Sequence, residues 1–234
     1  MSEWNLKRVW GTVSVAAEPE GFSIWLDKRP VRTPAKRALV LPTQAIARHV
    51  AAEWEAQAEQ VNPATMPWTR SANAAIDKVA MQRRAVIDHL AGYAGTDLLS
   101  YRAAEPVELV LRQQRAWDPL LDWLTSRLGV RFEVTQGVMP VEQDPASVSR
   151  LVRRMQPMSS FQLTGFQDLV TLSGSFVIAL AAADEAFPVS DLWSASCLDE
   201  IWQTEQWGED VEAAEEAARK MRAFHHAAEL IRLA

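Results

Sequence analysis

Hydrophobic and polar residues alternate with a period of two over residues 7–41 and follow a helical period after that. In the first segment, Phe22, Ile24 and Leu26 alternate with Ser23, Trp25 and Asp27. Proline and glycine residues separate several such short runs. The pattern predicts short strands joined by tight turns, in a small antiparallel sheet or partial barrel.

A helical pattern begins immediately after Pro42. Thr43 is suited to the N-cap position, and Ile46, Val50 and Trp54 then recur at intervals of four, with Ala58 one interval further. Two prolines interrupt the chain within residues 62–69, where we expect a hinge between two parts of the protein.

The remainder of the chain reads as helices. Predicted helices cover residues 71–91 and 105–128, and others begin at Asp144, at Ser159 or Ser160, and at Ser190 or Asp191. Residues 129–140 are expected to form a lone strand or a hairpin. The predicted fold class is therefore α+β: a small antiparallel β-rich N-terminal domain with one helix at residues 1–65, followed by a larger all-helical C-terminal domain at residues 66–234.

Composition limits the cell compartments and the classes of binding partner that we expect for this protein. The chain has 234 residues and a net charge of −6, so a basic face large enough for nucleic acid is not expected. Its single cysteine excludes an internal disulfide and fits a reducing compartment. The apolar stretch 169–183 falls short of the roughly 20 residues of a membrane span, so we expect a buried helix and no membrane insertion. The first ten residues resemble neither a secretory signal nor an organelle presequence, which favours a cytoplasmic protein.

The sequence offers few groups for catalysis. It contains no glycine-rich phosphate loop, and Cys197 has no basic neighbour to stabilise a thiolate. His225 and His226 are adjacent, so on a helix they point about 100° apart and cannot chelate one metal together. We therefore expect no catalytic residue, no metal site and no small-molecule cofactor.

The most distinctive segment is residues 197–210, which is rich in acids and tryptophans. On a single helix beginning at Ser190 or Asp191, Glu200 falls on one side with Trp193, Cys197 and Ile201. A carboxylate in such an apolar stripe needs a partner, because burying it alone costs several kcal/mol. That partner is an internal cation, a solvent-filled groove, or a cation on another protein.

The N-terminal segment carries a positively charged cluster, opposite in charge to the acidic segment 197–210. Its members are Lys28, Arg29, Arg32, Lys36 and Arg37. Such charges block unwanted pairing at a strand edge or dock an acidic partner surface.

Several motifs occur in colinear order along most of the chain, as in one known family. They begin with residues 26–34, LDKRPVRTP, and continue through LVLPT at 39–43, AAEWEAQ at 51–57 and NPATMP at 62–67. Thr69, AID at 75–77, TDLLSYR at 96–102, QQ at 113–114 and WDP at 117–119 follow, and LDE at 198–200, Gln203 and WGE at 207–209 close the series. The chain resembles the assembly chaperones of F-type ATP synthase that act on the alpha subunit of the catalytic head.

The resemblance implies a β-rich N-terminal domain, a larger helical domain, and a function without catalysis or ATP turnover. It implies that the protein holds the newly made alpha subunit and shields the surface that later meets the beta subunit. It also implies a functionally sensitive acid at Asp199 or Glu200 and a bacterial, cytoplasmic member of the family. We place the partner-binding site on the following residues: Asp199, Glu200, Trp202, Gln203, Glu205, Trp207 and Glu209.

Two other functions stay open at this point. Glu200 with a raised pKa, beside Asp199 or Glu205, would suit a carboxylate-using enzyme of unknown substrate. The chain could also be a structural or interaction subunit of the synthase, and copurification with the finished enzyme would separate a subunit from a chaperone.

Overall fold

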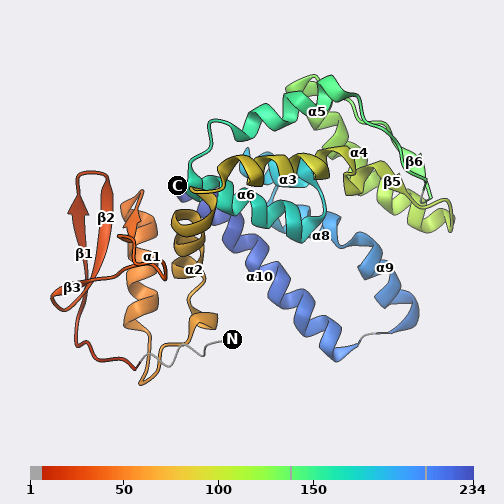
Figure 1. Cartoon of the computed structure of the whole chain (residues 1–234). Helices are drawn as coiled ribbons and strands as arrows, with labels where there is room; N and C mark the ends of the chain where they lie inside the picture. The colour runs from red at the N-terminus through yellow and green to blue at the C-terminus, as the bar shows by residue number, and fades with distance from the viewer. Residues whose placement is uncertain (1–6, 138, 209) are drawn as a thin grey trace. The chain divides into compact units, whose positions relative to one another are not determined.

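The computed structural model describes residues 7–137, 139–208 and 210–234. The chain forms two compact units, which draw on segments distant in sequence. The N-terminal unit comprises Met1–Arg83, Ser159–Gly165 and Glu229–Ala234, and the helical unit comprises Arg84–Met158 and Phe166–Ala228. Antiparallel strands come first and helices dominate afterwards, which confirms the α+β prediction (Figure 1). The units do not coincide with the expected domains 1–65 and 66–234, and that division stays a prediction.

A β-hairpin opens the N-terminal unit. Strands β1 (Val13–Glu18) and β2 (Gly21–Leu26) pair antiparallel, with Val13 opposite Leu26. Short strands β3 (Arg29–Pro30) and β4 (Val40–Leu41) both pair with β2. Gly21 has a φ of 148°, and a Cβ there would lie 2.2 Å from the Leu41 carbonyl oxygen, so only glycine fits.

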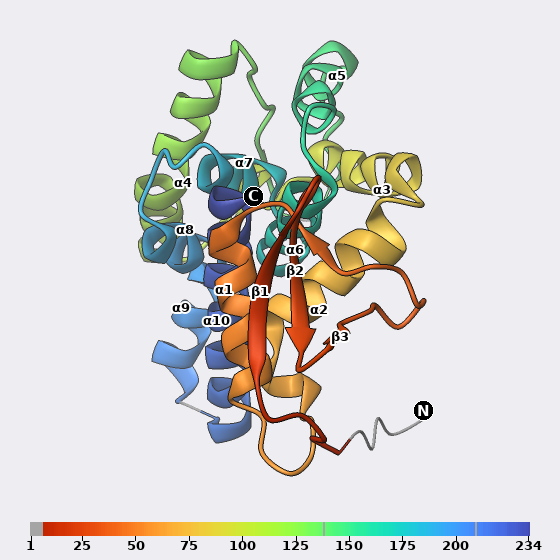
Figure 2. The same ribbon diagram turned by 90° about the vertical axis from the view of Figure 1, so that its left-hand side faces the viewer.

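Helix α1 (Gln44–Glu55) covers the hairpin, as Figure 2 shows. The Thr43 hydroxyl accepts a hydrogen bond from the Ile46 N–H, which confirms the predicted N-cap. Ile46, Val50 and Trp54 are buried as their spacing predicts, whereas Ala58 lies beyond the helix and is exposed. The Trp54 ring meets the Trp10 ring edge-on at 5.3 Å.

The helix predicted for residues 71–91 is two helices. A 3₁₀ turn (Pro63–Thr65) leads into α2 (Pro67–Ala74), which continues as a π-helical segment (Ala75–Val79) before a turn and α3 (Arg83–Gly95). Glu53 of α1 caps α2: its carboxylate accepts hydrogen bonds from the Trp68 N–H, the Thr69 N–H and the Thr69 hydroxyl. Burial raises the Glu53 pKa although these bonds favour its ionised form.

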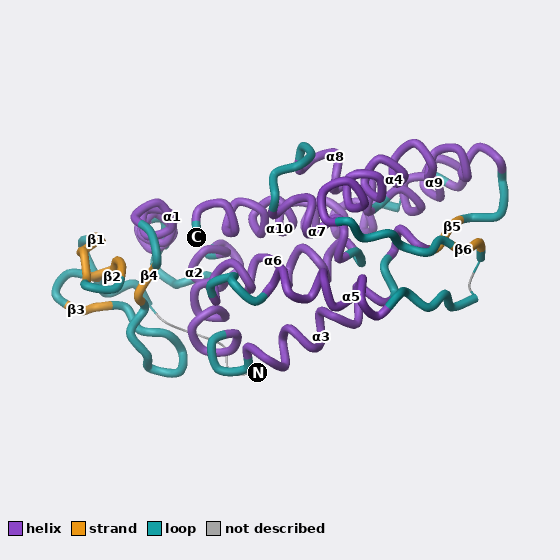
Figure 3. The backbone as a smooth tube through the Cα atoms, turned by 90° about the horizontal axis from the view of Figure 1, so that it is seen from above, coloured by secondary structure: helices purple, strands orange, loops and turns teal. Residues whose placement is uncertain are grey.

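Helices make up most of the helical unit (Figure 3). Helix α4 (Val107–Leu128) ends at Gly129 with a φ of 61°, and α5 (Pro145–Val152) is capped by Asp144, both as predicted. A 3₁₀ turn (Arg153–Met155) leads to α6 (Ser160–Ser173), and the Ser159 hydroxyl accepts the Gln162 N–H at its start. The remaining helices are α7 (Phe176–Ala183), α8 (Val189–Ser196), α9 (Leu198–Trp207) and α10 (Val211–Leu233).

The apolar stretch 169–183 is buried as predicted, but it is not one helix. Gly174, with a φ of 68°, separates α6 from α7. Asp97 sits before a 3₁₀ turn (Leu98–Ser100) and accepts hydrogen bonds from the Ser175 hydroxyl and the Val177 N–H, so a buried carboxylate supports the start of α7. Within the ranges given above, no helix combines the length and apolar character of a membrane span.

A strand or hairpin is expected at 129–140, and the structure has the two-residue strand β6 (Thr135–Gln136) within this range. It pairs parallel with β5 (Tyr101–Arg102). The alternating apolar residues before it serve mainly to anchor a loop, since Val130 and Phe132 are buried and Val134 is exposed.

Candidate partner-binding site

The segment that carries the predicted site is a separate helix. Cys197 interrupts the predicted single helix with φ −103° and ψ 18°, so α8 ends at Ser196 and α9 begins at Leu198. The prediction of one continuous helix was therefore wrong, but the residues expected on one side still face a common space, since all of them line the groove described below: Trp193, Cys197, Glu200, Ile201 and Thr204. Glu200 is exposed, so its carboxylate is not buried beside Trp193 and Cys197.

One face of α9 is attached to α4. Asp199 accepts a 2.8 Å hydrogen bond from Nε2 of Gln113, a residue only 1% exposed. The Arg112 guanidinium lies 4.9 Å from the centre of the Trp202 ring and forms an ion pair with Glu205. The hydrogen bond from Arg112 holds the pKa of Glu205 below its usual range.

A groove of about 850 Å³ runs beside α9 in the helical unit. Its lining comes from Leu98, the end of α6, the end of α8 with Cys197, and from α9 and α10. Four of its members are carboxylates: Glu200, Glu205, Asp210 and Glu216. The Lys220 ammonium, also in the lining, lies 3.9 Å from Glu216. In the described part of the chain, no cation lies within ion-pair distance of Glu200. Of the three possible surroundings for this carboxylate, the structure supports a solvent-filled groove.

Large apolar side chains are exposed near the same groove. Ile201 is 43% exposed and lines it, and Trp207, at the end of α9, is 79% exposed. Val211 and Met221 on α10 are 74% and 39% exposed. Exposed apolar groups of this size beside charged ones are typical of a surface that meets another protein.

The predicted site residues fall into two groups. Asp199, Trp202 and Glu205 contact α4 and position the helix, as described above. Glu200, Gln203 and Trp207 are exposed to solvent. Glu209 lies outside the described residues.

Sequence reasoning missed the two α4 residues that hold α9. Arg112 and Gln113 lie 93 and 86 residues from their partners in the chain, and no local period links such distant positions. The only signal was the Gln113-Gln114 pair among the colinear motifs.

The residues around α9 give little support to a catalytic site. Burial raises the pKa of the Cys197 thiol, which opposes formation of a thiolate. Across the described residues, no group of three or more His, Cys, Asp or Glu side chains is placed to hold a metal ion.

Comparison with known proteins identifies relatives of this chain. Residues 7–125 match the family model described as ATP12 chaperone protein. The structure is similar to the crystal structure of Atp12 from Paracoccus denitrificans, with 43% identity, a TM-score of 0.94 and 99% of each chain covered. An aspartate-to-lysine mutant of the Paracoccus protein gives the same values. The Atu1473 protein of Agrobacterium tumefaciens matches with 39% identity and a TM-score of 0.92, over 97% of this chain and 85% of that one. With a model that matches half of its length and relatives so similar over nearly all of it, this chain belongs to the ATP12 chaperone family.

Proposed function

We propose that this chaperone binds the unassembled alpha subunit of F-type ATP synthase in the bacterial cytoplasm and shields its beta-contacting surface until the catalytic head assembles. The observation that carries the proposal is the groove beside α9, where exposed apolar side chains adjoin the exposed carboxylate of Glu200. The family to which the chain belongs supports the choice of client.

The groove suits a client that waits for a permanent partner. Subunit surfaces that form obligate interfaces are large and more hydrophobic than ordinary protein surface. Ile201 and Trp207 offer apolar contacts to such a surface, while Glu200 offers charge to a basic residue of the client. Charge complementarity would set the orientation and speed of binding, and apolar burial would supply affinity.

In this proposal, one group of α9 residues positions the helix and the other contacts the client. Asp199, Trp202 and Glu205 hold the helix on α4 through Gln113 and Arg112. The exposed residues Glu200, Gln203 and Trp207 are then presented to the client on a fixed helix, which lowers the entropic cost of binding.

Co-expression with the alpha subunit alone, followed by size-exclusion chromatography, tests the proposal. We expect a soluble complex that dissociates when the beta subunit is added. Glu200→Lys should weaken the complex, whereas Glu133→Lys, the same charge reversal at an exposed site of the helical unit outside the groove, should not. Absence of any complex at low and moderate salt would refute the proposal.

The alternatives make different predictions. Membership of a chaperone family confirms the expectation that the chain is not an enzyme. A synthase subunit would copurify with the finished enzyme at fixed stoichiometry, and a chaperone would be left behind. The sequence has no glycine-rich phosphate loop, so we also expect no binding of Mg-ATP. The melting temperature should then not shift with Mg-ATP, since a ligand that binds only the folded state would raise it.

A further inference from the structure

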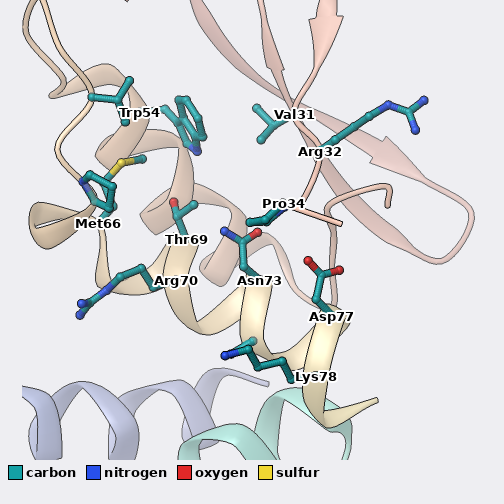
Figure 4. Close-up of a pocket in the computed structure, with 13 residues that line it drawn as sticks. Val31, Arg32, Pro34, Trp54, Met66, Thr69, Arg70, Asn73, Asp77 and Lys78 are labelled. Carbon is teal, nitrogen blue, oxygen red and sulfur yellow. The ribbon is translucent and has the colours of Figure 1, made fainter. Parts of the chain in front are cut away.

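The N-terminal unit contains a pocket of its own, distant in sequence from the acidic groove residues. Its volume is about 510 Å³, and its apolar walls include Val31, Pro34, Trp54, Val61 and Met66 (Figure 4). Arg32, Pro63 and residues of α2 and of the π-helical segment complete the lining.

The wall formed by residues 31–35 is fixed to the π-helical segment. The Asp77 carboxylate accepts hydrogen bonds from the Thr33 hydroxyl at 2.8 Å and the Ala35 N–H at 3.0 Å. Arg37 donates to the Ile76 carbonyl at 2.9 Å. These polar contacts hold the wall in place, so a ligand would not have to order it.

Two polar atoms of the lining are buried without a hydrogen-bond partner: Nε1 of Trp54 and Oδ1 of Asn73. Trp54 is only 6% exposed, and its indole nitrogen lies away from the surface of the protein. Figure 4 shows its indole nitrogen and the Asn73 carboxamide directed toward the same space. A buried donor and a buried acceptor left unpaired are costly, and a ligand that pairs with both recovers that cost. Met66 beside them has a flexible side chain that can move aside for such a ligand.

The chemistry of the ligand follows from these groups. A peptide unit carries one acceptor and one donor, which match the Trp54 N–H and the Asn73 oxygen. The apolar walls accept a hydrophobic side chain. Arg70 and Lys78 on the rim are exposed, and neither has an ion pair within the described ranges, so they would attract a carboxylate.

We propose that this pocket binds an extended segment of another polypeptide in which an apolar residue adjoins an acidic one. The segment's peptide group bonds Trp54 and Asn73, its apolar side chain fills the pocket, and its carboxylate meets Arg70 and Lys78. The proposal is independent of the client assigned to the acidic groove, and it gives the protein a second, oppositely charged contact surface.

Tryptophan indole resonances test this directly. The probe is acetyl-Ala-Leu-Glu-Ala-amide, titrated into ¹⁵N-labelled full-length protein, with the Trp54 indole peak assigned by its loss in Trp54→Phe. We expect a saturable downfield shift of that peak, since its N–H gains an acceptor. Replacing the leucine of the probe by serine, or its glutamate by glutamine, should weaken binding. A Trp54 peak that stays fixed while the probe reaches millimolar concentration would overturn the proposal.

A matched variant separates the pocket from the core. The Trp10 ring packs on Trp54 but does not line the pocket. Trp10 is as buried as Trp54, and its indole N–H likewise has no hydrogen-bond partner, so Trp10→Phe is the matched control. Monitored by backbone amide shifts, Trp54→Phe and Asn73→Leu should each weaken probe binding about three- to tenfold, the usual effect of one lost hydrogen bond. Trp10→Phe should leave binding within about twofold. Equal losses in all three variants would mean that packing alone matters.

The same variants then locate the natural occupant. If alpha subunit binds the wild type and Trp54→Phe weakens that complex, the segment belongs to the client. If alpha subunit does not bind but the probe does, the proposed function fails while the pocket proposal stands. A monomer–dimer equilibrium abolished by Trp54→Phe would identify the occupant as a second copy of this chain and refute a separate partner.

Discussion

Arg112 on α4 binds Glu205 on α9, with Nη1 2.9 Å from Oε1 and 2.7 Å from Oε2. The same guanidinium lies over the Trp202 ring. One side chain therefore fixes the second half of α9, and Gln113, its neighbour in the chain, fixes the first half through Asp199. The α9 surface proposed to meet the client depends on two consecutive residues of a different helix.

Arg112→Gln should weaken client binding more than it changes stability. The ion pair is exposed to solvent, so its loss should leave the melting temperature nearly unchanged. Helix α9 would lose its attachment near Trp207, and affinity for the alpha subunit should fall. Arg84→Gln, which removes an exposed pair with Asp88, is the control and should affect neither. Equal affinities of the two variants would show that the attachment has no part in binding.

Asp199 and Glu200 should separate a structural role from a contact role. Asp199→Ala leaves the buried Nε2 of Gln113 without its acceptor, which should cost about 1–3 kcal/mol of unfolding free energy, and Asp199→Asn should restore most of it. Glu200→Gln should leave the unfolding free energy unchanged because the side chain is exposed, yet lower client affinity. Urea denaturation and a binding titration on all three variants give both quantities. Unchanged affinity in Glu200→Gln would remove this residue from the contact surface.

The sequence predicted features that depend on neighbours in the chain. The Thr43 cap, the Gly129 helix end and the buried run before Ala183 all follow from local chemistry or from a period of hydrophobic residues. The break at Cys197 has no such signal, because neither proline nor glycine stands there, and α8 and α9 were therefore expected as one helix. No local signal reveals that Glu53 is buried and caps a helix fifteen residues later. Tertiary contacts of this kind override local pattern.

Asp97 should make stability depend on pH. Burial raises its pKa from 3.8 to about 6, although the Leu99 N–H, the Val177 N–H and the Ser175 hydroxyl donate to the charged form. Between these two values the native state binds more protons at this site than the unfolded state, so stability falls as pH rises through the window. Above pH 6 the contribution is constant.

Comparison with Asp97→Asn isolates this effect. The variant does not titrate, and its amide group faces the Val177 N–H, so it should be less stable at every pH. The stability advantage of the wild type should be largest near pH 4 and should shrink by on the order of 3 kcal/mol by pH 6 to 7. Urea denaturation at steps of half a pH unit measures the difference. An advantage that grows with pH over this range would mean that Asp97 is ionised throughout.

Trypsin should cut first after Arg83 or Arg84. The division between the two units falls between these residues, directly after an exposed turn in which Met81 is 61% exposed. The Arg84 side chain is 94% exposed and lies in the first turn of α3, and residues 80–82 just before that helix form no regular helix. Arg70 is a poorer site, because it lies inside α2 between the buried residues Thr69 and Ser71, and cleavage needs an unfolded stretch of backbone.

The two fragments should stay together after this cut. The core of the N-terminal unit includes Phe161 and Leu230, and the Thr43 hydroxyl donates a 2.8 Å hydrogen bond to the Leu233 carbonyl, so residues beyond the cut complete that unit. Size-exclusion chromatography of the nicked protein should show one species, and mass spectrometry of that species should find both fragments. The double variant Arg83→Gln, Arg84→Gln should resist the first cut. A first cut after Arg70, with fragments that separate, would instead support independent domains divided near residue 65, because each part would then hold its own core.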